Sequence, residues 1–275
     1  MRIFEIKDYR DRFGREYKLV VEDWDDGKIV PKPVIGIMLT YNCDDYLRKC
    51  LKAIENQVDK VYALDNGSTD NTISILKDMN IDYITSKRKG DLSWLMNKNM
   101  QRIPKNVWCL YVNPDEILFE LPKGFIGKYS SFLEDNEIYA SDVRFPDFIY
   151  NYRTLFAGFD WGDGPGVYWS ARRIFRYNGS EQFRGPIHYN ISNMREGQQN
   201  PIFNNEHAGF WGGTVAKTEL IQLFHFGKCR GIERQRGKGE RLISGEDIAQ
   251  GNVPTRPYYG PLPSVMGRYD AKKGC

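Results

Sequence analysis

The sequence predicts an α/β protein built on a parallel sheet, and three observations predict it. Three apolar runs indicate buried strands, at residues 34–39, 61–64 and 107–112. Each run ends in a polar turn, and two of the turns lead into a segment with the apolar spacing of a helix. Strand, turn, helix and strand in succession are typical of a parallel α/β sheet. Because the carboxyl ends of parallel strands share one edge, we expect the three turns to meet in one crevice.

The same patterns predict the remaining elements. Residues 1–33 are polar and aromatic around an Asp25-Asp26-Gly27 turn, which predicts a hairpin added to the main sheet. From 139 to about 226, aromatic and glycine-rich segments predict short antiparallel strands and loops. Four helices and one more strand are expected in between: helices over 45–55, from a cap at Ser68 or Thr69 to about Asn80, over 92–102 and over 124–135, and a strand at 81–84.

The composition is that of an ordinary globular protein. The chain has 275 residues, of which 41% are hydrophobic and 27% charged, and its formal net charge of +3 is too small to indicate nucleic-acid binding by itself. No apolar run approaches the roughly 20 residues of a membrane-spanning helix, and the N-terminus lacks the apolar core of a signal peptide. Five widely spaced cysteines without a CxxC motif fit a reducing compartment. We therefore expect a cytoplasmic protein with no transmembrane segment.

The first two turns carry the residue types of a nucleotide site. Asp65 ends a buried strand and is followed by Asn66-Gly67, which lets the chain turn tightly away. The Asp65 carboxylate could therefore accept a hydrogen bond from a nucleobase imino N–H. Thr40-Tyr41-Asn42 follows the preceding strand and could contact base and ribose, with Tyr41 as a flat wall. The alternative for both turns is ordinary turn and cap chemistry.

The third turn, Asn113-Pro114-Asp115-Glu116, places acids at the end of a very apolar strand. Carboxylates are costly in such a place without a partner. A divalent cation that bridges to a diphosphate is one such partner, because Mg²⁺ and Mn²⁺ bind carboxylate, phosphate and water oxygens. The alternative is a capped loop that binds no metal.

The order of these three motifs resembles that of the family 2 glycosyltransferases of the GT-A fold. The usual acid motif of that family reads D-x-D or D-A-D-E, whereas Asn113 stands at its first position here. Asp115 keeps the position that ligates the metal most directly in the family. Gly90 and Asn97, after the basic Lys87-Arg88-Lys89, resemble the family's G…N segment near the nucleotide.

The resemblance extends with less specificity to about residue 190. Arg172-Arg173-Ile174-Phe175-Arg176, followed by Gly185-Pro186-Ile187-His188, resembles an "RLFR…G-x-H-E" element of a bacterial and viral subgroup. Tyr189 replaces the acid of that element. His188 is therefore a candidate to complete a metal site or to contact phosphate, and the alternative is a structural histidine.

The resemblance implies a metal-dependent, inverting transferase that uses a nucleotide-sugar donor, with UDP as the expected nucleotide. It assigns Asp115 and His188 to a Mn²⁺ or Mg²⁺ ion. The residues assigned to the nucleotide are Thr40, Tyr41, Asn42, Asp65, Asn66, Gly67, Arg88, Asn97 and Asn113.

The implied fold is a GT-A type Rossmann-like mixed sheet flanked by helices, with an N-terminal hairpin and a loop-rich C-terminal extension. The hairpin is expected over 1–33 and the catalytic domain over 34–226. Within that domain we expect a nucleotide-binding half (34–122) and an acceptor half (123–226). A basic extension is expected over 227–275.

Direct displacement by a hydroxyl group needs a carboxylate that accepts its proton. Asp163 and Asp160 are the candidates for this base, because they flank Trp161 in a glycine-rich loop that suits an acceptor mouth. The alternative is a solvated surface loop, and Asp147 and Glu206 are the next candidates. His225 could be a packing residue or the edge of a site.

The acceptor is left open by the sequence. A glycan, a lipid-linked glycan and a hydroxylated base in nucleic acid all fit, and the basic tail is either a solvated face or a contact to a polyanion or membrane surface. Two other functions remain as alternatives. One is a catalytically silent nucleotide- or glycan-binding module, and the other is a sugar nucleotidyltransferase, although its usual glycine-rich N-terminal loop is absent.

Overall fold

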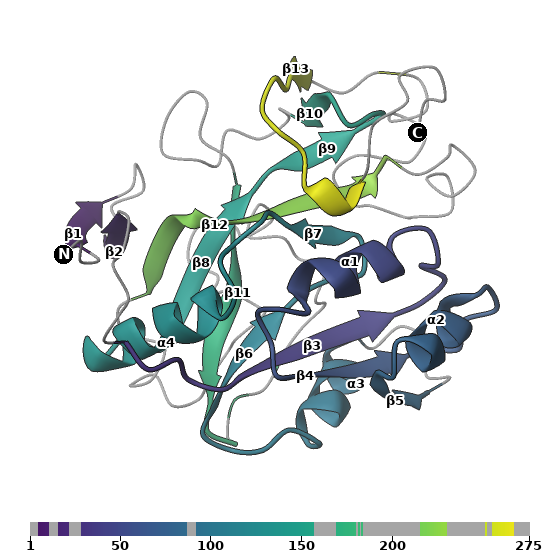
Figure 1. Ribbon diagram of the computed structural model, residues 1–275, viewed down its shortest axis with the longest axis horizontal. Coiled ribbons are helices and arrows are strands. Elements are labelled where there is room, and N and C mark those ends of the chain that lie inside the picture. The colour runs from purple at the N-terminus through teal and green to yellow at the C-terminus, as the bar shows by residue number, and fades with distance from the viewer. Residues whose placement is uncertain are drawn as a thin grey trace.

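The computed structural model describes residues 5–10, 16–21, 29–86, 92–156, 169–179, 181, 183, 215–229, 251 and 255–266. Across these residues one mixed sheet of 13 strands forms the centre of the protein, and helices lie against it (Figure 1). The predicted α/β class, a mixed sheet flanked by helices with an N-terminal hairpin, is confirmed.

The parallel part of the sheet holds the predicted strands. Strand β3 (Val34–Thr40) lies between β6 (Val107–Tyr111) and β4 (Lys60–Asp65), and β5 (Asp82–Thr85) follows β4 at the edge. All three pairings are parallel. Thr40 pairs with Asp65, and Ile37 pairs with Tyr111. The turns that follow β3, β4 and β6 therefore leave the sheet at the same edge, as the sequence predicts.

The rest of the sheet is more irregular than expected. Strand β11 (Trp169–Tyr177) runs antiparallel between β6 and β8 (Ala140–Phe145). Strand β12 (Ala216–Lys228) has 13 residues and is parallel to β2, β8 and β9 (Asp147–Ile149), so the expectation of short antiparallel strands is wrong here. Its long path also pairs it with β7 (Glu116–Leu118), directly after the third turn.

The outer strands complete the sheet. The N-terminal hairpin consists of β1 (Glu5–Arg10) and β2 (Glu16–Val21), so the prediction that its strands flank Asp25-Asp26-Gly27 is wrong. Strand β2 joins the sheet through β12. At the other side, β10 (Thr154–Phe156) pairs with β9 and with β13 (Thr255–Pro257).

Four α-helices and one 3₁₀ helix occur in the described part of the chain. They are α1 (Leu47–Ile54), α2 (Thr72–Asp78), α3 (Leu92–Met100), α4 (Phe125–Asp135) and η3 (Ser264–Met266). The prediction of a cap at Ser68 or Thr69 is wrong, because α2 starts after Asn71. Ser68 instead gives its hydroxyl hydrogen bond to Asp65. None of these helices is long and apolar enough to cross a membrane.

Alternate residues of the central strands enter two separate apolar clusters. Val34 and Met38 pack with the buried stripe of α1, whose members recur at helical spacing. Ile35 and Ile37 pack in the second cluster with Met96 of α3. The sheet is therefore buried on both faces, as strands of a parallel sheet usually are. Its polar turns are left at the edge.

Candidate active site

The turn after β4 is built around the carboxylate of Asp65. This side chain is only 1% exposed and accepts four hydrogen bonds from its surroundings. One oxygen accepts from the hydroxyls of Thr40 (3.0 Å) and Ser68, and the other accepts from the backbone N–H groups of Gly67 (2.9 Å) and Ser68 (2.9 Å). Gly67 has φ of 82°, a value that favours glycine, and this lets the chain fold back onto the carboxylate. Thr40, Asp65 and Gly67 thus fix the shape of the turn.

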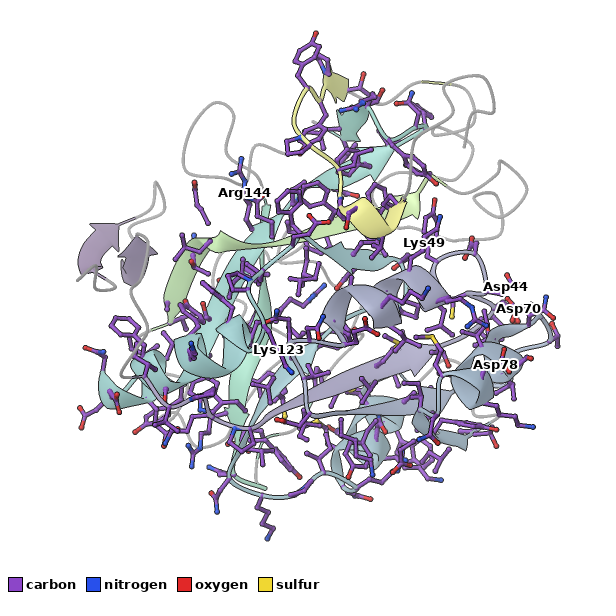
Figure 2. The ribbon with its side chains drawn as sticks, in the orientation of Figure 1. Asp44, Lys49, Asp70, Asp78, Lys123 and Arg144 are labelled. Carbon is purple, nitrogen blue, oxygen red and sulfur yellow. The ribbon has the colours of Figure 1, made fainter. Side chains whose placement is uncertain are left out.

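Asn42 ties the first turn to the second. Its backbone N–H donates to the Ser68 hydroxyl (2.9 Å), and its side-chain oxygen accepts from the Thr69 backbone N–H (2.8 Å). A second tie lies beside it, where the backbone N–H of Asp44 donates to the Asp70 carboxylate at 3.2 Å (Figure 2). These contacts join the two predicted nucleotide turns into one surface.

Two side chains on this surface are available to a ligand. Tyr41 is 57% exposed, which fits the predicted flat wall. The Oδ1 atom of Asn66 is buried and has no hydrogen-bond partner, while its backbone N–H donates to the Thr40 carbonyl at 2.8 Å. A buried acceptor without a donor is costly, so this amide oxygen is a natural partner for an incoming N–H or O–H group.

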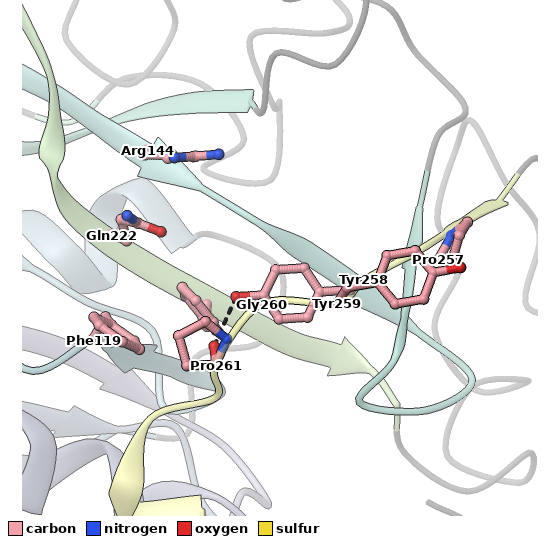
Figure 3. A pocket seen from close by; sticks show the side chains of 9 residues that line it. Phe119, Arg144, Gln222, Pro257, Tyr258, Tyr259, Gly260 and Pro261 are labelled. Carbon is pink, nitrogen blue, oxygen red and sulfur yellow. Dashed lines mark hydrogen bonds between the residues drawn. The ribbon is translucent and has the colours of Figure 1, made fainter.

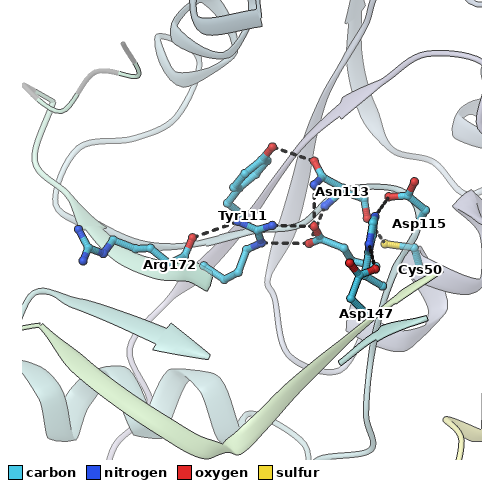
Figure 4. A network of polar contacts seen from close by, with 9 residues as sticks. Cys50, Tyr111, Asn113, Asp115, Asp147 and Arg172 are labelled. Carbon is cyan, nitrogen blue, oxygen red and sulfur yellow. Dashed lines mark hydrogen bonds and ion pairs between the residues drawn. The ribbon is translucent and has the colours of Figure 1, made fainter. Parts of the chain in front are cut away.

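The third turn is organised by a buried ion pair. Glu116 binds Arg173 through two parallel hydrogen bonds, from Nε (3.0 Å) and Nη2 (2.7 Å). Asn113 donates to the same carboxylate from its backbone N–H (3.0 Å) and from Nδ2 (2.6 Å), and its Oδ1 accepts from the Tyr111 hydroxyl (2.7 Å) (Figure 4). Glu116 therefore belongs to the frame of the turn. The Asn113 side chain, predicted to bind the nucleotide, already has a partner at each end.

Protonation states follow from burial in this turn. Burial raises the pKa of the Tyr111 hydroxyl above its usual value, so it stays a donor to Asn113. Burial, followed by the negative charges of Glu116 and Asp115, raises the pKa of the Cys50 thiol well above its usual value. The thiol therefore keeps its proton and donates a hydrogen bond to the Asn113 carbonyl at 3.4 Å. This contact attaches α1 to the turn.

Asp115 faces a histidine that the sequence left unassigned. Nε2 of His225 lies 3.7 Å from Oδ1 of Asp115, and Nδ1 of the same ring lies 2.7 Å from Oδ1 of Asp147. Strand β12 makes this possible, because His225 pairs with Glu116 of β7 and with Asp147 of β9. A Cβ atom on Gly227 would lie 2.6 Å from His225 Nε2 and 2.7 Å from Asp115 Oδ2, so only glycine leaves room there.

The pair Asp115 and His225 fits part of a divalent-metal site. A carboxylate oxygen and a neutral imidazole nitrogen are both ligands that Mn²⁺ accepts. Asp147 would hold the histidine in the required tautomer, as carboxylates commonly do behind metal-bound histidines. Within the described ranges no group of three or more His, Cys, Asp or Glu forms a closed metal site. The remaining ligands would have to be phosphate and water oxygens, which suits Mg²⁺ and Mn²⁺.

Several residues that the sequence predicts for the site fall outside the part of the chain that the structure describes. Arg88, Asp160, Asp163, His188 and Glu206 lie outside the described residues.

Asn97 and the arginines of β11 have partners within the fold. Asn97 donates to the carbonyl of Phe183 (2.8 Å) and accepts from its N–H (2.7 Å), so both ends of its amide are occupied. Arg172 pairs with Asp142 (3.2 Å), and Arg176 pairs with Glu134. The basic segment of β11 is therefore neutralised pair by pair.

A cavity of about 440 Å³ lies on the other face of the β8–β12 region. Arg144, Gln222 and Phe224 contribute to its lining, together with Tyr258 and Tyr259 (Figure 3). Since side chains alternate along a strand, Arg144 and Phe224 point away from the face that carries their neighbours Phe145 and His225. This cavity therefore lies away from Asp115 and His225, neither of which lines it.

Comparison with known proteins assigns the family. The model of "Glycosyl transferase family 2" matches residues 37–200, which is more than half of the chain. The chain belongs to glycosyl transferase family 2. A curated relative, the SPbeta prophage-derived glycosyltransferase SunS of Bacillus subtilis (strain 168), is 28% identical over 162 residues, or 58% of this chain. The match covers 34% of SunS, so the family 2 chain spans about a third of that relative.

Solved structures show weaker likenesses. S. aureus TarS has 19% identity and a TM-score of 0.35, over 44% of this chain and 22% of TarS. Glucosyl-3-phosphoglycerate synthase from Mycobacterium tuberculosis, in complex with Mn²⁺ and UDP-glucose, has 14% identity and a TM-score of 0.37, over 46% of this chain and 50% of that one. Such low scores carry no argument about the chemistry of this chain.

Proposed function

We propose that this family 2 protein is a metal-dependent glycosyltransferase that transfers a sugar, with inversion, from a UDP-linked donor to a hydroxyl acceptor. The observation that carries the proposal is the alignment of Asp115, His225 and Asp147 next to the nucleotide turns. Family membership supports the reaction class. It also speaks against the alternative of a sugar nucleotidyltransferase.

The first two turns would bind the nucleotide. Tyr41 offers an exposed ring against the base, and Asn66 offers the amide oxygen that lacks a donor. An imino N–H that reached Asp65 would have to share a carboxylate that already accepts four hydrogen bonds. We therefore expect Asp65 to support nucleotide binding in two ways. It holds the shape of the turn, and its carboxylate can accept a hydrogen bond from the base.

Asp115 and His225 are the residues that would hold Mn²⁺ or Mg²⁺ in the described part of the chain. Such an ion stabilises the negative charge of a diphosphate leaving group. Asp147 keeps the proton on Nδ1 of His225, so that Nε2 presents its lone pair toward Asp115. His188, the ligand predicted from the sequence, remains a proposal for a further contact.

The transfer itself needs a base on the acceptor side. The bond from the anomeric carbon to the diphosphate oxygen breaks as the acceptor oxygen bonds to that carbon, and a carboxylate takes the hydroxyl proton. Asp163 and Asp160 remain the proposed bases. Asp147 is a weaker candidate than the sequence indicates, because its carboxylate holds His225.

The acceptor remains open in class. A glycan, a lipid-linked glycan and a hydroxylated base in nucleic acid are all compatible with a hydroxyl nucleophile. A polyanion contact through the basic segment after residue 227 stays part of the proposal for acceptors that carry phosphate.

Donor hydrolysis tests the proposal without knowledge of the acceptor. The intact protein is incubated with a panel of UDP-sugars, with Mn²⁺ and with EDTA, and released UDP is measured. We expect slow hydrolysis of at least one donor with Mn²⁺ and none with EDTA. Asp115→Asn should remove several kcal/mol of transition-state stabilisation, whereas Asp78→Asn, in a surface ion pair with Arg48, should change nothing.

Two results would contradict this proposal in different ways. Undiminished hydrolysis in EDTA would reject the metal role. Tight UDP binding without hydrolysis of any donor, in the presence of Mn²⁺, would favour the catalytically silent nucleotide-binding module.

A further inference from the structure

The third turn, Asn113-Pro114-Asp115-Glu116, is called the acid turn below. Arg173 reaches it because strand β11 is irregular at this residue. Arg172 pairs with Asp142 of β8, but the next pair is Ile174 with Ser141, so Arg173 is an extra residue in the ladder. A bulge of this kind redirects the side chain that it contains. In this case the redirected side chain is the arginine that binds Glu116.

The environment of Arg173 uses features that only arginine has. Its guanidinium makes two parallel hydrogen bonds to Glu116 and lies between two aromatic rings, 4.8 Å from the centre of Tyr111 and 5.3 Å from that of Phe145. The two ionised side chains are 7% and 0% exposed. Lysine cannot reproduce a planar, bidentate and stacked contact. Because buried ion pairs add little net stability, a positioning role is the better account of this one.

Asn113 completes the same frame from the other side. Its Nδ2 group lies 2.6 Å from Oε1 of Glu116, and Tyr111 donates to its Oδ1. An aspartate at this position, as in the usual motif of the family, would bring a second carboxylate to hydrogen-bond distance of Glu116. A carboxylate has no N–H to donate, so the 2.6 Å hydrogen bond to Oε1 of Glu116 would become a contact between two acceptor oxygens. The amide is therefore the side chain that supplies the donor that Glu116 needs here.

We propose that Arg173, Glu116 and Asn113 form a positioning frame that leaves Asp115 directed at His225, and that Asn113 is part of this frame and not a lost metal ligand. Glu116 accepts two hydrogen bonds from Arg173 and two from Asn113, which fills its lone pairs. The carbonyl of Asp115 accepts from the N–H of Phe226 at 2.9 Å, which holds the turn against β12. The statement about metal rests on the proposed function, whereas the statement about the frame does not.

The first test restores the consensus acid. Asn113→Asp is compared with the wild-type protein by thermal unfolding without metal and by Mn²⁺ titration calorimetry without donor. The frame predicts a melting temperature lower by about 5 °C or more and no gain in Mn²⁺ affinity. Mn²⁺ binding that is about tenfold tighter, or an unchanged melting temperature, would overturn the proposal.

A double variant checks that the loss comes from Glu116. Asn113→Asp combined with Glu116→Gln keeps a single carboxylate in the frame. Its loss of melting temperature should be clearly smaller than the sum of the two single losses, because directly interacting sites are not additive. Additive losses would show that the two side chains do not act on one another, and the proposal would fall.

The second test asks whether the frame acts on the metal site. Arg173→Lys should weaken Mn²⁺ binding by about tenfold, on the scale of groups that orient metal ligands. Arg172→Lys is the matched control, because its guanidinium pairs with Asp142 and points away from the acid turn (Figure 4). Mn²⁺ affinity in the control should stay within about twofold of wild type even if its melting temperature falls.

The outcomes separate the frame from the proposed function. Equal loss of Mn²⁺ affinity in both lysine variants, or none in either, would reduce Arg173 to a structural residue and overturn its positioning role. If the wild-type protein binds no Mn²⁺ even in the presence of UDP, the metal-dependent function fails. In that case the melting temperatures of Asn113→Asp and of the double variant still decide whether the frame exists.

Discussion

Replacing Asp147 by asparagine tests the geometry of the candidate metal site most directly. Asp147 is buried, with its side chain 4% exposed, and its Oδ1 lies 2.7 Å from Nδ1 of His225. An ionised carboxylate can only accept a hydrogen bond, so Asp147 places a proton on Nδ1, and in the neutral ring the lone pair is then on Nε2, toward Asp115. Asparagine has the same shape but can present its N–H₂ group instead, which would favour the opposite tautomer.

The expected magnitude follows from this arrangement. Partners that orient a metal-bound histidine are worth about 10- to 100-fold in metal affinity. At about 1.4 kcal/mol per tenfold, Asp147→Asn should therefore cost roughly 1.4–2.7 kcal/mol of Mn²⁺ binding free energy. Calorimetric titration of the intact protein with Mn²⁺, without donor, measures this change. Asp142→Asn is a control with an equally buried acid whose partner, Arg172, lies elsewhere.

One result would refute the reasoning about Asp147. If Asp147→Asn binds Mn²⁺ as tightly as wild type but transfers sugar much more slowly, the carboxylate does not orient a ligand. Asp147 would then return as a candidate for the general base. A wild-type affinity together with wild-type turnover would instead remove His225 from the site.

Three further predictions concern other parts of the protein. Asp65→Ala should weaken UDP binding by about 1–3 kcal/mol and also lower the melting temperature, because the groups that donate hydrogen bonds to Asp65 lose a buried acceptor. Unchanged UDP affinity by calorimetry would contradict this. Asp163→Asn should slow transfer by about 10²-fold at unchanged donor affinity, and normal single-turnover rates would exclude it as the base. Although burial opposes ionisation, hydrogen bonds from Trp108 and Arg176 hold the pKa of Glu134 below its usual value. The stabilisation by Glu134 should thus be complete above the unfolded pKa of about 4.3 and disappear as the pH falls through the lower folded pKa, so Glu134→Gln should flatten this part of an acid-unfolding curve.

The strands and the positions of the turns after β3 and β4 could be predicted because their signals are local. The run 34–39 is apolar throughout, which is typical of a strand buried on both faces, and the structure has that strand in two cores. Helix α1 follows from the spacing of its apolar residues. Ser68 shows where local signals fail. Its hydroxyl suits a helix cap, but in the structure this hydroxyl donates its hydrogen bond to the buried Asp65 carboxylate.

The candidate metal site could not be completed from the sequence because its parts meet through long-range pairing. His225 lies 78 residues from Asp147 along the chain, and only the pairing of β12 with β7 and β9 brings it to Asp115. The available signal was a single polar residue within Leu223–Phe226, followed by Gly227. The contact of Arg173 with Glu116 could not be predicted for a similar reason, because a bulge depends on the pairing of two strands and not on the sequence of one.

The two adjacent carboxylates of the acid turn, Asp115 and Glu116, have different surroundings, although both are acids of one sequence motif. Glu116 has its lone pairs filled by protein donors, so it has none left for an ion. Asp115 instead lies 3.7 Å from Nε2 of His225, a ring whose Nδ1 lies 2.7 Å from Asp147. A module that only bound a nucleotide would need the turns after β3 and β4, but it would not need this alignment. The arrangement therefore favours a transferase over a silent module, and metal-dependent release of UDP from a sugar donor is the measurement that separates them.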